Sequence, residues 1–221
     1  MGHPYLSFSR STNYDGYVVG TSSSGTLGNG LLNKSVKIVQ IPSSFNSIQV
    51  VEVGYRAFRG TGITSVFIPK TVKYLGYACF CNCESLSDVR FEPNSQLEKA
   101  GMDVFGVCYS LINIDLPASL KTLEYNKYFY LFDGMNSLEF CSYLGTTDFA
   151  SAYIFKNSPT IRVSSSYPSD QFGRKTVTYK DGSTCGVSNE PFYEETKKAT
   201  FFIRIKRVPQ LLKIMILVLV S

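Results

Sequence analysis

An internal repeat constrains the fold of this 221-residue chain more than any other feature of its sequence. The segments around Phe58, Phe80 and Phe105 align with one another, and a looser copy begins at Phe132. After Phe80 and Phe105 the sequence follows F-x-x-C-x-x-L-x-x-φ-x-φ, where φ is an apolar residue. Repetition of this kind indicates similar coils stacked in a row, because no single coil can bury its own apolar face.

The residues that flank each Phe stay in the same register. The pattern φ-x-x-φ-G lies upstream of each Phe and ends at Gly54, Gly76 and Gly101. The φ-x-φ triplets end at positions 41, 68, 91, 116, 143 and 163, which are 27, 23, 25, 27 and 20 residues apart. A proline directly follows several triplets, and it ends the strand because it cannot donate to a ladder.

The triplets have the two-residue alternation of a strand that buries one face. We therefore expect Val66–Ile68, Val89–Phe91 and Ile114–Leu116 to be consecutive rungs of one parallel sheet. The aromatic side chains should fill the interior at the coil corners. The predicted repeat core consists of Phe58, Phe80, Phe105, Cys83, Cys108, Leu86 and Leu111.

On these motifs the sequence resembles the BspA-like leucine-rich-repeat family. The segments that carry the resemblance are VVEVGYRAFRGTGITSVFIP, VKYLGYACFCNCESLSDVRFEP and LEKAGMDVFGVCYSLINIDLP, with CSYLGTTDF and IRVSSSYPSDQF resembling the closing coil of protozoal members. The resemblance covers residues 36–178. It implies a mostly β, right-handed solenoid with a parallel sheet along one face and short irregular caps. It also implies a surface antigen or adhesin without catalytic residues.

The chain divides into four predicted parts. Residues 1–35 form an N-terminal flank or cap, 36–178 the solenoid, 179–198 a linker and 199–221 a basic and apolar tail. The tail ends in LLKIMILVLV, which is too short to span a membrane alone and has basic residues before it. It is interpreted as a truncated membrane anchor, a degenerate tail without a folded role, or an amphipathic peripheral helix.

The composition argues against most kinds of catalytic or nucleic-acid-binding site. The only histidine is His3, so a hydrolase triad lacks its base. The first 193 residues hold 16 basic and 15 acidic side chains, which gives no basic face for nucleic acid. We expect no enzymatic activity, no catalytic or metal site and no cofactor.

The cysteines allow three interpretations. Cys79, Cys81 and Cys83 form C-x-C-x-C, but this is not zinc-knuckle spacing and no histidine lies nearby. Cys83 and Cys108 occupy one repeat position, which favours buried structural side chains. A disulfide between these two remains open, because adjacent rungs lie within bridging distance.

Candidate partner-binding residues lie at two places. The positions between the buried residues of successive rungs should share one solvent-facing side. The segment EYNKYFYLF lacks the usual repeat signature and is either an imperfect coil, which we favour, or an exposed aromatic patch. At the strand positions there is an alternative to partner binding. The Phe67 ring would pack on neighbouring side chains, and Arg90 and Asp115 would form a weak ion pair between adjacent rungs. The candidates are Phe67, Arg90, Asp115, Tyr125, Tyr128 and Tyr130.

Two functions are compatible with these features. The first is a recognition solenoid that binds a protein or a cell-surface ligand, without nucleic acid and with possible membrane attachment through the tail. The second is a degenerate repeat fragment with only a structural role. The resemblance implies a cell-surface or extracellular location, whereas the N-terminus lacks the pattern of a secretory signal and leaves a cytoplasmic one open.

Overall fold

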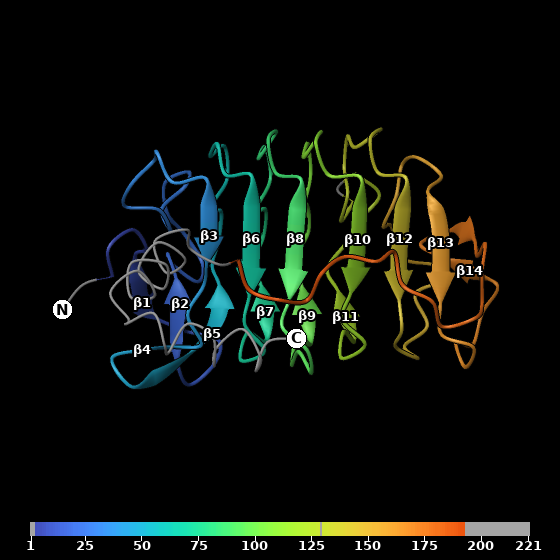
Figure 1. Ribbon diagram of the computed structural model, residues 1–221, viewed down its shortest axis with the longest axis horizontal. Helices are drawn as coiled ribbons and strands as arrows, with labels where there is room; N and C mark the ends of the chain where they lie inside the picture. Colours follow the sequence, from blue (N-terminus) through green and yellow to red (C-terminus); the bar gives the residue numbers. More distant parts are fainter. Residues whose placement is uncertain (1–2, 129, 193–221) are drawn as a thin grey trace, which may run out of the picture. The chain divides into compact units, whose positions relative to one another are not determined.

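The computed structural model describes residues 3–128 and 130–192 (Figure 1). Strands, turns and irregular segments make up this part of the chain, and none of its residues is helical. The strands are β1 (Phe8–Arg10), β2 (Tyr17–Val19), β3 (Ile38–Gln40), β4 (Ser44–Phe45), β5 (Ile48–Val53), β6 (Ser65–Ile68), β7 (Tyr74–Leu75), β8 (Asp88–Phe91), β9 (Lys99–Ala100), β10 (Asn113–Leu116), β11 (Thr122–Leu123), β12 (Phe140–Tyr143), β13 (Thr160–Val163), β14 (Gln171–Phe172) and β15 (Lys175–Thr176).

The longer strands of successive coils lie side by side along one face (Figure 1). Strands β3, β6 and β8 pair in parallel, and so do β10, β12 and β13. The solenoid with parallel strands is therefore confirmed, but the expectation of one continuous sheet is wrong. The ladder is broken between β8 and β10, where a hollow lined by Asp88 and Asn113 lies at the starts of the two strands.

A second ladder runs through the short strands. β5, β7, β9 and β11 pair in parallel through the last two residues of each φ-x-x-φ element, and β5 alone extends further towards its N-terminal end. At the N-terminus β2 continues this ladder and β1 folds back on it antiparallel. The carboxylate of Glu52 is fully buried and accepts hydrogen bonds from Ser11, Asn13 and Ser22, which ties the N-terminal residues to the first coil.

The interior holds a continuous column of stacked phenylalanine rings. Successive centroids of Phe58, Phe80, Phe105, Phe132 and Phe155 lie 5.2, 5.5, 5.7 and 5.6 Å apart, with planes 4–14° from parallel. All five rings are at most 2% exposed. The column continues through the looser fourth copy, so the interior of that coil is preserved even where its sequence signature is weak.

Cys83 and Cys108, which occupy the same position of successive repeats, each form a hydrogen bond to the preceding coil. The thiol of Cys83 donates to the carbonyl oxygen of Phe58 at 3.0 Å, and that of Cys108 to Phe80 at 3.2 Å. All six cysteines are free, so the Cys83–Cys108 disulfide is not formed. The residues that the structure describes contain no group of three or more potential metal ligands.

These thiols should react slowly in the folded protein. Burial raises the pKa of Cys83 to about 11 and that of Cys108 well above its usual value, and the thiolate is the reactive form. We expect iodoacetamide at pH 8 to leave both residues unmodified until denaturant is added. Peptide mass mapping with and without denaturant measures this, and rapid labelling of Cys83 in the folded chain would contradict it.

Candidate partner-binding surfaces

The solvent-facing side of the longer strands carries a row of polar side chains. Asp115 of β10, Ser142 of β12 and Arg162 of β13 are register partners, and Arg90 occupies the equivalent outward position of β8. The hydroxyl of Ser142 donates to the Asp115 carboxylate. The row therefore combines one carboxylate, one hydroxyl and two guanidinium groups.

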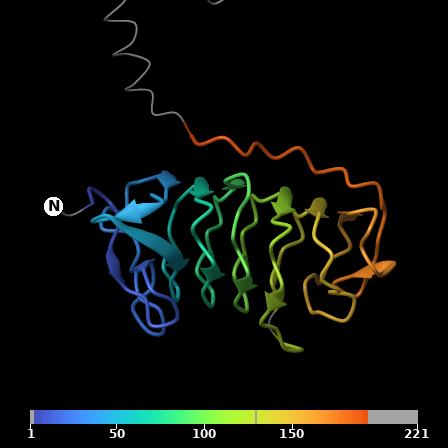
Figure 2. The same cartoon turned by 90° about the horizontal axis from the view of Figure 1, so that it is seen from below.

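A segment near the described C-terminal end lies across this row. Tyr179 bridges to Arg162 of β13, and Gly182 donates to the carbonyl oxygen of Val163 at 3.0 Å. Residues 183–190, which we name the strap, then cross from β13 towards β8 (Figures 1 and 2). Residues 179–191, predicted from the sequence to be part of a linker, lie in the same compact unit as the coils.

Asp115 fixes the middle of the strap. Its Oδ1 accepts the backbone N–H of Cys185 at 2.7 Å, and its Oδ2 accepts that of Val187 at 3.0 Å. Burial, followed by the charge of Asp115, raises the pKa of the Cys185 thiol to about 12. The carboxylate is therefore occupied by the chain's own backbone.

The two arginines fix the ends of the strap. Nη1 of Arg162 donates to the hydroxyl of Ser183 at 2.7 Å, and Nη1 of Arg90 donates to the carbonyl oxygen of Glu190 at 3.0 Å. Three strands of the face thus hold one crossing segment. The contacts that Arg90, Asp115 and Arg162 make with the strap are all hydrogen bonds.

Two expectations for this face are wrong. Phe67 does not face solvent, since only 6% of it is exposed, which fits the alternative of packing against neighbours. Arg90 does not pair with Asp115. It forms a forked contact with Asp88, whose carboxylate lies 2.6–3.1 Å from Nε and Nη2, because residues two apart on a strand share one face.

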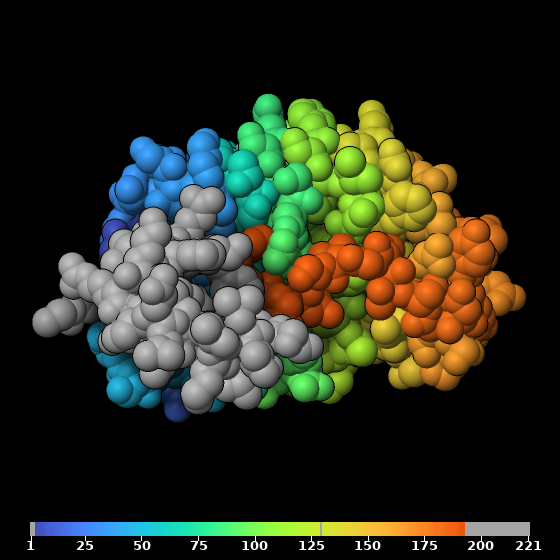
Figure 3. All heavy atoms as spheres, in the orientation of Figure 1, coloured from blue at the N-terminus to red at the C-terminus, as the bar shows by residue number. Residues whose placement is uncertain are grey.

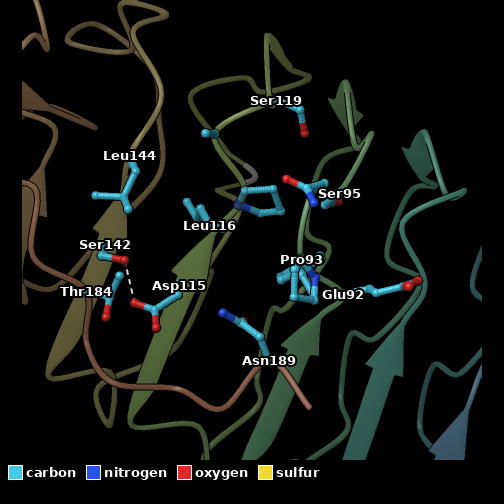
Figure 4. Close-up of a pocket in the computed structure, with 14 residues that line it drawn as sticks. Glu92, Pro93, Ser95, Asp115, Leu116, Ser119, Ser142, Leu144, Thr184 and Asn189 are labelled. Carbon is cyan, nitrogen blue, oxygen red and sulfur yellow. Dashed lines mark hydrogen bonds between the residues drawn. The ribbon is translucent and has the colours of Figure 1, made fainter. Parts of the chain in front are cut away.

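A cleft of about 290 Å³ lies beside the strap (Figure 4). Pro93 and Leu116 line it from β8 and β10 and the turns after them, and Leu144 lines it from the end of β12. Thr184 and Asn189 of the strap contribute to the wall as well. The cleft is thus formed jointly by the coils and the strap.

The fourth coil contains an insertion that its spacing explains. Leu75 precedes Phe80 by five positions, as Ala100 precedes Phe105, whereas Leu123 precedes Phe132 by nine. The ladder and the ring column hold both ends in register, so the extra residues must leave the coil. Figure 2 shows the segment after β11 projecting beyond its neighbours. The coil is imperfect in this segment and regular in its interior.

The inserted segment exposes tyrosines beside cations. Tyr128 is 66% exposed and Tyr125 41% exposed, and Lys127 lies 5.0 Å from the Tyr128 ring. The ring of Tyr153 lies 5.8 Å from Tyr125 and 5.4 Å from Tyr130. We name Tyr125, Tyr128, Tyr130 and Tyr153 the tyrosine cluster.

Sequence reasoning missed the strap and its partners on β12 and β13. Ser142 and Arg162 stand between the apolar residues of their φ-x-φ triplets, as Arg90 and Asp115 do, so extending the repeat by two coils could have found them. The strap, STCGVSNE, has no apolar periodicity and gave no such signal.

Solved structures similar to this chain include two leucine-rich-repeat proteins and one vaccine antigen. One from Bacteroides capillosus is 24% identical, with a TM-score of 0.47, over 64% of this chain and 94% of that one. One from T. pallidum is 21% identical, with a TM-score of 0.44, over 64% and 70% of the two chains. The pneumococcal vaccine antigen PcpA is 18% identical, with a TM-score of 0.44, over 77% and 49%. No curated protein matches the chain.

Stacked coils, parallel strands side by side along one face and an interior column of repeat residues define a leucine-rich-repeat solenoid. The profile of the BspA-type leucine-rich-repeat region matches residues 51–170 in six copies. The chain belongs to this BspA-type family. Repeats of this type typically serve as non-enzymatic scaffolds.

Residues 193–221 lie outside the described part of the chain, so the three interpretations of the tail stay open. In the part that the structure does describe, no helix has the length and apolar character needed to cross a membrane.

Proposed function

We propose that the chain is a non-enzymatic recognition module, adhesin-like, that binds a protein ligand at the cell surface or outside the cell. The observation that carries this proposal is the projecting insertion, which exposes Tyr125 and Tyr128 next to Lys127. The family resemblance to surface antigens supports the location.

Tyrosines at such positions suit protein recognition. A tyrosine ring offers a large, rigid apolar face with a hydroxyl at its edge, and ring ordering costs little entropy because few bonds rotate. Aromatic residues and arginine are enriched at protein interfaces, where a few of them carry most of the binding free energy. Arg174 lies 4.5 Å from the Tyr153 ring and adds an arginine to the cluster.

The test compares adhesion of the full chain with that of a Tyr125→Ser/Tyr128→Ser variant. Cultured cells and a panel of immobilised extracellular-matrix proteins serve as probes. We expect at least about a tenfold loss of binding, as for the removal of two interface tyrosines. Because both rings are exposed, the melting temperature should not change. Tyr109→Ser is the matched control, since Tyr109 is 53% exposed and lies outside the cluster.

Two results would count against the proposal. If the double variant adheres as well as the wild type, the tyrosine cluster is not the binding surface. If the wild-type chain binds none of the probes, the structural repeat remnant becomes the better description.

A further inference from the structure

The contact between Asp115 and the strap recognises backbone rather than side chains. Its carboxylate takes the N–H groups of Cys185 and Val187, while Arg90 takes the carbonyl oxygen of Glu190. Hydrogen bonds to an ionised acceptor are stronger than neutral ones. Because every polypeptide has such groups, the site selects a chain conformation more than a particular sequence.

That conformation depends on Gly186. In an extended strand the N–H groups of residues i and i+2 lie about 6.5 Å apart, too far to meet one carboxylate. Gly186 has a φ of 77°, and a left-handed residue between two others turns successive N–H groups towards a common anion. A Cβ at Gly186 would meet nothing within 4 Å, so glycine is needed there for its backbone freedom.

The strap buries little of its surface against the coils. Ser183, Cys185 and Val187 are half-buried and alternate with exposed residues, so no side chain of the strap is fully buried. Little apolar area therefore holds it in place, and the hydrogen bonds it makes can be replaced by those of another segment.

We propose that the face carrying Arg90, Asp115 and Arg162 is a binding site for a short peptide segment of a partner protein, and that the strap is an internal occupant of the same site. The segment it fits has a glycine-centred turn, free backbone N–H groups on both sides of that glycine and small side chains towards the sheet. This site is separate from the tyrosine cluster, so either can fail without the other.

The first experiment weakens the strap in the full chain. Val187→Pro removes one N–H that Asp115 accepts, whereas the matched control Val187→Ala keeps it. The probe is a labelled peptide of residues 183–190 carrying Cys185→Ser, and binding is measured by fluorescence anisotropy. A tethered segment competes at millimolar effective concentration. We expect the probe to bind the Val187→Pro chain at least tenfold more tightly than the wild type or Val187→Ala.

The second experiment tests recognition of the turn. We expect a probe with Gly186→Ala to bind the Val187→Pro chain at least fivefold more weakly, because an L-residue resists this φ. A probe with D-alanine at that position should bind as glycine does. Adding Asp115→Ala to the Val187→Pro chain should abolish binding, and Asp115→Asn, which preserves side-chain shape, should weaken it.

Four outcomes would overturn the proposal. Three of them are equal probe binding by the wild-type and Val187→Pro chains, binding that survives Asp115→Ala, and equal binding of the L-alanine and D-alanine probes. Absence of probe binding to every chain also overturns it, and leaves the strap as a structural part of the fold. None of these outcomes bears on adhesion through the tyrosine cluster.

Discussion

Replacing Phe80 by Ala should destabilise the solenoid by about 3–5 kcal/mol, the usual cost of removing a buried phenylalanine. The ring is completely buried and stacks on Phe58 at 5.2 Å and on Phe105 at 5.5 Å. Its removal leaves a cavity that touches two coil interfaces, and a repeat array depends on the contact between each coil and the next. Urea denaturation followed by circular dichroism measures the change in the free energy of unfolding.

A matched substitution on the surface separates packing from a general effect of losing a ring. Tyr109→Ala removes an aromatic side chain that is 53% exposed, and it should change the free energy of unfolding by less than about 0.5 kcal/mol. If Phe80→Ala unfolds at the same urea concentration as the wild type, the ring column does not support the stack.

The sequence predicted those parts of the fold that depend on apolar spacing. Phe58, Phe80 and Phe105 recur with fixed neighbours, and a fixed interval between buried rings can be satisfied only by stacked coils. The same alternation identified the outward positions of Arg90 and Asp115, because it specifies the side of the strand on which a residue lies.

The segment that covers the outward side of the longer strands could not be predicted in the same way. The strap is held by a carboxylate, two guanidinium groups and backbone N–H groups, and such contacts leave no apolar period in the sequence. Phe67 was expected to face solvent for a related reason, since alternation gives the direction of a side chain but not what covers it. For the insertion that carries Tyr125, Tyr128 and Tyr130, the aromatic composition was recognised from the sequence. Its four extra residues relative to the other coils were not.

Replacing Gly76 by Ala should push two coils apart. A Cβ at this position would lie 2.9 Å from the carbonyl carbon of Gly54 and 3.0 Å from the backbone nitrogen of Tyr55. These neighbours are backbone atoms of the preceding coil and cannot rotate away, and carbon atoms at rest lie about 3.5–4.0 Å apart. The coils must therefore separate, which strains the 2.7 Å hydrogen bond from Gly76 N to the carbonyl oxygen of Val53. We expect a loss at the upper end of the roughly 1–3 kcal/mol that overpacking costs.

A second glycine shows whether space or backbone conformation is responsible. Gly60 has a φ of 70° and nothing within 4 Å of its Cβ position, so Gly60→Ala costs only the left-handed conformation. Asparagine tolerates that conformation, and Gly60→Asn should restore most of the stability. Gly76→Asn should instead be worse than Gly76→Ala, because the larger side chain meets the same backbone. Urea denaturation of the four variants decides the matter: if asparagine rescues stability at position 76 as well, close contact between coils is not what requires glycine there.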